Sequence, residues 1–212
     1  MANDNAKPKP RRSRADGELS RGRILDAATE IAAERGYEGT SIGAVSKKCG
    51  LPASSIYWHF KDKDDLLAAV IERSFGTWLA AWTFPAEGVT RESTAQLGSQ
   101  TAKALLDSPD FLRLGLMLAL ERRPVEPRAR ARFLAVRHEA HQVLGEGIRG
   151  TYPGLSEAQV RELTTYTLAG ADGLFIAKEI DGDGVDLIAL MTLHAQAVVD
   201  CADRMLAEGA AS

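Results

Sequence analysis

The sequence has few cysteines and no long apolar run. Its 212 residues include only Cys49 and Cys201, which lie far apart and form no metal-ligand or redox motif. A reduced, cytoplasmic protein with two free thiols is therefore the simplest interpretation. The longest apolar run, LGLMLALE after Arg113, is far shorter than the roughly 20 residues of a membrane-spanning helix. The polar, basic N-terminus has no apolar stretch behind it and does not resemble a secretory signal.

Signatures of catalysis are also missing. No nucleophile–base pair, metal-ligand constellation or phosphate-binding loop is recognisable, so we expect no enzyme, no metal site and no cofactor. We find neither the alternating pattern of β-strands nor an internal repeat. With 45% hydrophobic and 26% charged residues, the composition is that of a globular protein.

The net charge of −3 conceals an uneven distribution. Residues 1–63 contain 12 Lys+Arg and 8 Asp+Glu, a balance of +4, and the remaining residues contain 14 and 21, a balance of −7. A basic N-terminal third on an acidic body suggests that one end meets a polyanion, although a solvated charged face would look the same. The segment KPKPRRSR could likewise lie along a nucleic acid or act as a solubilising tail.

Apolar residues recur at spacings of three and four along most of the chain, which predicts an all-α protein of about nine helices. Residues 1–18 are polar and contain prolines, and we expect a disordered basic arm there. Residues 19–66 should form a domain of short helices, and residues 67–212 a domain of longer helices with wide apolar faces. The expected helix caps are Thr40, Asp62 and Ser156 with Gln159, and the expected helix stops are Gly36 and Gly50.

Two short predicted helices separated by CGLP indicate a helix-turn-helix, whose second helix enters the major groove of DNA. The small Ala53, Ser54 and Ser55 at its start allow close approach to base edges. Ile56 and Phe60, one turn apart, face inward and hold the helix on its supports. The remaining side chains can donate to phosphates that flank the groove, and they are Tyr57, Trp58, His59, Lys61 and Lys63.

Residues 20–67 resemble the DNA-binding domain of the TetR family of bacterial transcriptional repressors. The resemblance covers the helix before Gly36, the Thr40 cap, the turn at Gly50, and the YWHF cluster followed by two lysines. It implies a homodimeric repressor that binds a palindromic operator and is released by a small effector. Carried over residue by residue, it implies DNA contacts at Thr40, Ser41, Ala53, Ser54, Ser55, Tyr57, Trp58, His59, Lys61 and Lys63.

This sequence departs from the family pattern at the start of the second helix-turn-helix helix. Pro52 replaces the usual capping serine, so a cap must come from elsewhere. Gly43 and Ala53 stand where many family members have Arg, Lys or Gln for base recognition. Short side chains, water and DNA shape are therefore expected to carry more of the specificity.

The resemblance also implies an effector pocket in the C-terminal helices. Trp78 and Trp82 lie one turn apart and could clasp an apolar ligand, or they could be ordinary core. Asp172, on an otherwise apolar face, needs a partner, which could be an arginine, a helix cap or a cationic ligand. The candidate ligand-binding residues are Trp78, Trp82, Phe111, Leu114, Met117, His138, His141, Asp172 and Phe175. Their apolar majority favours a hydrophobic effector, and a metal at the two histidines lacks a third ligand.

The last two predicted helices, over about residues 157–179 and 185–207, each have two apolar faces, one of which can pack inward and the other against a second copy, which would give a four-helix dimer interface. The pattern does not say which face does which. The candidate dimer-interface residues are Leu174, Met191, His194, Val198, Val199 and Ala202. The expected partners are double-stranded DNA, a second copy and a small effector, with no membrane. A constitutive DNA-binding regulator without an effector is the alternative.

Overall fold

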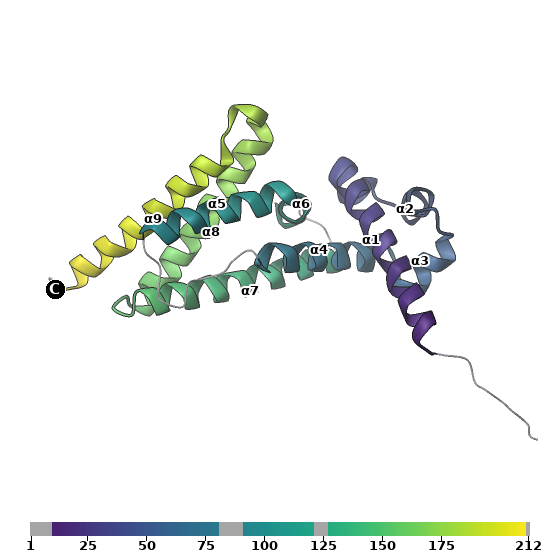
Figure 1. The fold of residues 1–212 in the computed structure, drawn as a ribbon, viewed down its shortest axis with the longest axis horizontal. Helices are drawn as coiled ribbons and strands as arrows, with labels where there is room; N and C mark the ends of the chain where they lie inside the picture. Colours follow the sequence, from purple (N-terminus) through teal and green to yellow (C-terminus); the bar gives the residue numbers. More distant parts are fainter. Residues whose placement is uncertain (1–9, 81–90, 121–126, 211–212) are drawn as a thin grey trace, which may run out of the picture.

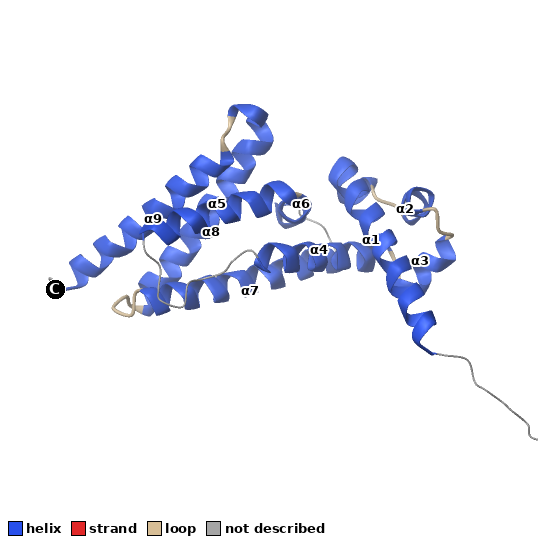
Figure 2. Cartoon of the chain, viewed as in Figure 1, coloured by secondary structure: helices blue, strands red, loops and turns tan. Residues whose placement is uncertain are grey.

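The structure is a computed structural model that describes residues 10–80, 91–120 and 127–210. These residues form nine α-helices and one short 3-10 helix, with no strand in the described ranges (Figure 2). The expected all-α class is confirmed. The helices are α1 (Pro10–Gly39), α2 (Ile42–Cys49), α3 (Ala53–His59), α4 (Lys63–Ala80), α5 (Arg91–Asp107), α6 (Asp110–Leu120), α7 (Arg128–Thr151), α8 (Glu157–Asp181) and α9 (Leu187–Ala210), with η1 (Gly182–Gly184) between the last two.

The molecule is elongated, with α1, α2 and α3 forming a head at one end (Figure 1). Helices α4 and α7 run side by side along the long axis and connect the head to a body of α5, α8 and α9. One apolar core runs from Ile24 in α1 to Met191 in α9, and therefore crosses the division expected at residues 66 and 67. A second cluster around Leu163 and Leu168 fills the far end of the body. None of the described helices combines the length and apolarity that a bilayer crossing requires.

The first helix begins earlier than the sequence predicts. Of the arm expected over residues 1–18, the part from Pro10 onward is helical, and residues 1–9 lie outside the described ranges. Proline suits the first turn of a helix, where its missing N–H is not needed. The helix then meets α3: a Cβ on Gly17 would lie 3.6 Å from the Trp58 ring, and Ser20 Oγ lies 2.8 Å from His59 Nε2. These tertiary contacts are not visible in the local sequence pattern.

The helix ends in the head follow mostly local rules. Gly36 and Gly50 both have φ of 67°, and they interrupt α1 and end α2, as expected. The α2 cap is Ser41 rather than Thr40, because the Ser41 hydroxyl accepts a 3.2 Å hydrogen bond from the Ala44 N–H. Asp62 caps α4 as predicted, through a 2.8 Å bond from the Asp65 N–H.

Candidate DNA-binding surface and effector cavity

Helices α2 and α3 are locked into a helix-turn-helix by bonds to the turn between them. The Gly50 N–H donates to the Ser46 carbonyl over 3.1 Å, and the Ser46 hydroxyl donates to the Leu51 carbonyl over 2.7 Å. Arg23 of α1 donates to the Cys49 carbonyl over 2.6 Å. Ile56 of α3 is fully buried. The orientation of α3 relative to α1 is therefore set by this apolar contact together with the hydrogen bonds to the turn.

One face of α3 is presented to solvent with most of the predicted DNA contacts on it. Tyr57 is 57% exposed and Trp58 is 75% exposed, which is unusual for rings of this size. Pro52 precedes the helix without a side-chain cap, so the small first-turn residues are bordered by free backbone amides. Of the predicted contacts, Ser41, Ser54 and Lys61 are also exposed, and Ala53, Ser55 and His59 are partly exposed.

Two predicted DNA contacts are engaged inside the protein. Thr40 is only 1% exposed, and its hydroxyl donates to the Gly36 carbonyl over 2.8 Å. Its side chain therefore supports the α1–α2 turn instead of facing a phosphate. Lys63 Nζ donates to the Tyr37 carbonyl over 3.1 Å and lies 4.4 Å from the centre of the Tyr37 ring. Within the described residues, the Lys61 ammonium has no such ion-pair or carbonyl partner.

The surroundings of His59 disfavour its charged form. Burial lowers the pKa of its imidazole, and the positive charge of Arg21 lowers it further. One ring nitrogen lies 2.8 Å from the Ser20 hydroxyl, and the ring packs edge-on against Trp58 with 4.6 Å between centroids. His59 is therefore suited to hydrogen bonding and to orienting Trp58, and it contributes little positive charge at neutral pH.

Four of the apolar residues predicted to line an effector pocket are core residues. Trp78 and Phe111 stack in an aromatic cluster with Phe75, with ring centroids 5.6 to 5.9 Å apart, and Phe111 continues to Phe133. Leu114 and Phe175 are buried in the same core. The methyl group of Met117 lies against Gly36, so Met117 joins α6 to the head instead of lining a pocket. Trp82 lies outside the described residues.

The polar candidates line an open groove between α7 and α8. Asp172 accepts a 2.6 Å bond from Arg137, which confirms the arginine partner among the predicted alternatives. Burial raises the pKa of the Asp172 carboxyl, and Arg137 opposes that shift. His138 and His141 line the same groove of about 680 Å³. No group of three metal-ligating side chains is found among the described residues.

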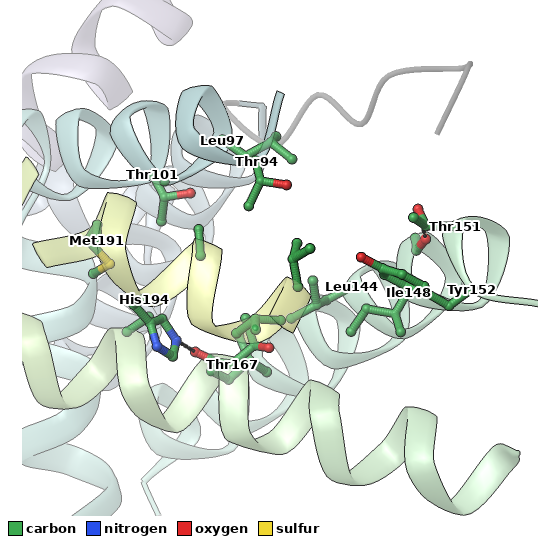
Figure 3. A pocket seen from close by; sticks show the side chains of 17 residues that line it. Thr94, Leu97, Thr101, Leu144, Ile148, Thr151, Tyr152, Thr167, Met191 and His194 are labelled. Atoms are coloured by element: carbon green, nitrogen blue, oxygen red, sulfur yellow. Dashed lines mark hydrogen bonds between the residues drawn. The ribbon is translucent and has the colours of Figure 1, made fainter. Parts of the chain in front are cut away.

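A separate apolar cavity of about 130 Å³ lies between α5, α7, α8 and α9 (Figure 3). None of the eight predicted ligand residues that the structure describes lines it. Four of the predicted dimer residues do instead, namely Met191, His194, Val198 and Val199, and α5 adds Thr94, Leu97 and Thr101. The pattern Thr94, Leu97, Gly98, Thr101 has helical spacing and was the available sequence signal for this wall.

Among the described residues, the cavity lining contains no Asp, Glu, Lys or Arg. The lining histidine, His194, approaches the Thr167 carbonyl over 2.9 Å through Nε2 (Figure 3). An ionised ligand would therefore lose its hydration without gaining a charged partner, which is costly. A cavity of similar size in another protein, lined by apolar side chains, stays dry and accepts benzene. This geometry suits a neutral, ring-sized apolar group.

Three of the six residues predicted for a dimer interface are buried within the single chain. Met191, Val199 and Ala202 are buried within the single chain, because α5 and α8 cover both apolar stripes of α9. Leu174 packs partly against the main core. The glycine at position 170 permits close approach within the chain, since a Cβ there would overlap the His194 ring. Of the six predicted residues, Leu174, His194 and Val198 are partly exposed in the single chain.

Comparison with known proteins identifies the N-terminal segment. Residues 24–70, from the first core residue of α1 to the second turn of α4, match the model of bacterial regulatory proteins of the tetR family. This segment therefore resembles the DNA-binding part of tetR-family regulators. The transcriptional regulator AcrR of Shigella flexneri is 38% identical over 64 residues, which are 30% of this chain and 30% of AcrR. The chain spans less than half the length of the curated relatives that it matches.

Solved tetR-family structures share the fold over both head and body. The regulator FadR of Bacillus halodurans superposes with a TM-score of 0.69 at 19% identity, covering 91% of this chain and 96% of FadR. SmeT, a repressor from Stenotrophomonas maltophilia solved with triclosan, superposes with a TM-score of 0.68 at 18% identity, covering 86% and 90%. At these identities the likeness concerns the fold.

Proposed function

We propose that this chain is a transcriptional repressor that binds a palindromic operator as a homodimer and releases it when a small neutral apolar effector binds. In this proposal the α2–α3 unit binds the DNA. The small residues in the first turn of α3 fit a major groove, and the exposed Tyr57 and Trp58 fit its flanking phosphates. The match of residues 24–70 to the family model also supports DNA binding by this unit. Specificity then rests on Ser54, Ser55 and DNA shape, since long base-recognising side chains are missing from α3.

Lys61 takes the phosphate-contact role within this proposal, since Lys63 is engaged with Tyr37. We expect Lys61→Ala to weaken binding about equally across operator variants and to reduce the slope of log K against log salt by about 0.9 per subunit. The measurement is fluorescence anisotropy with a duplex selected from a random pool, at a series of salt concentrations. Lys103→Ala removes the same charge from an exposed position on α5 and should leave the slope unchanged. Equal slopes for Lys61→Ala and the parent would contradict the contact, and failure to select any duplex would refute DNA binding.

The apolar cavity is the proposed effector site. Its uncharged lining and its volume of about 130 Å³ favour a neutral ligand or ligand moiety of about one ring. The complex of the related SmeT with triclosan supports an apolar ligand class for this fold. A regulator without an effector is the competing proposal, and ligand binding at the cavity separates the two.

Toluene and benzoate form a matched pair of probes, since they differ by one ionised group. We expect toluene to stabilise the protein by about 1.4 kcal/mol at tenfold excess over its Kd, and benzoate to have no effect. Ala195→Leu should fill the cavity and abolish the toluene response in a thermal-shift assay. The control is Ala189→Leu on the exposed side of α9, which should keep that response. A toluene response that survives Ala195→Leu would move the site elsewhere.

The outer face of α8 is the proposed dimer interface. Tyr166, Ala169, Gly173, Ile176 and Ile180 recur at spacings of three and four, and all are exposed in the single chain. We call these five residues the α8 stripe. Exposed apolar side chains at this spacing match the seam of a helix bundle, and the adjacent α9 adds the exposed Leu193. A self-complementary pairing across a two-fold axis would bury the stripe and position two heads for two half-sites.

A further inference from the structure

The carboxylate of Asp64 binds donors from two distant parts of the chain. Asp64 lies in the first turn of α4, and its Oδ2 accepts the Arg128 N–H over 2.6 Å. Its Oδ1 accepts the Ala129 N–H and the Tyr37 hydroxyl, each over 3.1 Å. Arg128 and Ala129 open α7, whereas Tyr37 belongs to the head. One side chain therefore joins the head to the start of α7.

This carboxylate replaces the missing cap of α7. Pro127 precedes α7 and makes no side-chain cap hydrogen bond to the amides of the first turn. A negative charge is favoured at a helix N-terminus, because it interacts with the unsatisfied amides and the helix dipole. The sequence suggests that Asp64 serves α4, in whose first turn it lies. In the structure it serves a helix that begins 64 residues later.

We propose that Asp64 is the positioning residue through which α7 and the head influence each other, so that α7 carries the effector signal. The inference rests on the proposed function and names its route of regulation. The cavity is lined by residues of α5, α7, α8 and α9, and by none of α4. Leu144 and Thr151 of α7 lie 16 and 23 residues beyond Arg128, or about 24 to 35 Å along the helix. A shift of α7 at the cavity therefore changes the geometry at Asp64.

Beside the apolar packing of α7 on α4, the other polar links between these helices lie at the surface. Arg132 pairs with Glu72 over 3.1 Å, but Glu72 is mostly exposed, and such surface pairs contribute little. Arg128 lies 3.5 Å from Asp62 and 3.6 Å from Asp65, also at the surface. The Asp64 bonds instead use backbone amides of a helix terminus, which cannot rotate away as side chains can. Glu72→Ala is consequently a matched control, since it removes an α4–α7 contact and leaves the α7 amides capped.

The first test is hydrogen exchange at single amides in the free protein. Asp64→Ala should raise the exchange rates of Arg128 and Ala129 by about tenfold or more, since each loses a bond to a charged acceptor. Asp64→Asn keeps the side-chain size and should give a smaller increase, which covers the case in which the alanine variant does not fold. Glu72→Ala should leave both rates unchanged. Unchanged rates in both Asp64 variants would overturn the capping role and the proposal with it.

The second test adds the selected duplex. In the parent, duplex binding should change the exchange of Arg128 and Ala129 by about fivefold or more, because coupling between two sites acts in both directions. The Asp64 variants should bind the duplex without transmitting this change to α7, and Glu72→Ala should transmit it. A parent that binds duplex with no change at α7 would overturn the proposal. A parent that binds no duplex would refute the proposed function, and the free-protein rates would still decide whether Asp64 caps α7.

Discussion

Ile176→Glu is expected to yield monomers and to weaken binding to a two-half-site duplex by about 10² to 10⁴-fold. Ile176 is a 40% exposed member of the α8 stripe, so glutamate costs little in the monomer. In a dimer the same position faces its own symmetry mate or a near neighbour, and two carboxylates there would be desolvated without a cation. In a dimer, binding of one head to its half-site raises the local concentration of the second head at the other half-site. A monomer loses this effect.

Two measurements test this expectation together. Sedimentation velocity reports the oligomeric state, and binding to duplexes with one or two half-sites reports the linkage between heads. The variant should match the parent on one half-site and lose affinity on two. Leu134→Glu is the control, because Leu134 on α7 is 41% exposed and lies outside the α8 stripe. A stable dimer in the Ile176 variant would exclude the α8 stripe as the interface.

Gly98→Ala is expected to destabilise the protein by about 1 to 3 kcal/mol, even though alanine favours a helix by about 1 kcal/mol. A Cβ at position 98 would lie 2.7 Å from the Met191 carbonyl oxygen and 2.9 Å from the Thr192 Cα. Both are backbone atoms of α9, so the strain cannot be relieved by a change of side-chain rotamer. Helix α5 must move away from α9, and both helices form walls of the cavity.

Thermal unfolding with Gly76→Ala as the matched control decides this prediction. A Cβ at Gly76 in α4 has no neighbour within 4 Å, so that substitution should stabilise the protein by up to about 1 kcal/mol. The two substitutions add the same methyl group to a helix and are expected to have opposite signs. At about 2 to 4 °C per kcal/mol for a chain of this size, the difference is readily measured. Equal stabilisation by both would mean that α5 does not pack against α9 this closely.

The head was largely predictable because its signals are local. Gly36 and Gly50 interrupt helices through their own backbone conformations, and Ile56 and Phe60 are buried because their spacing follows one face of a short helix. The local signals were less decisive where two adjacent residues could both cap a helix. Thr40 and Ser41 are both capping residues, and only the course of the backbone makes Ser41 the cap.

In the body, the spacing of apolar residues did not predict which helix faces are covered within the chain. The two apolar stripes of α9 are real, but α5 and α8 cover both, so Met191 and Val199 face inward. The α8 stripe carries outward apolar side chains, with alanine and glycine between the larger residues. A hydrophobic pattern specifies that a face is covered, but it does not specify whether the cover comes from the same chain or from a second copy.

The sequence by itself determined the helical class, the helix-turn-helix, most helix caps and the family of the head, because each depends on residues within a few turns of one another. Only the tertiary structure decided the cavity between α5, α7, α8 and α9, the placement of Trp78 and Phe111 in the core, and the role of Asp64. These features join residues as far apart as Asp64 and Arg128 or Gly98 and Met191. Their contacts arise from how whole helices pack, and packing geometry is a property of pairs of surfaces that no single helix encodes.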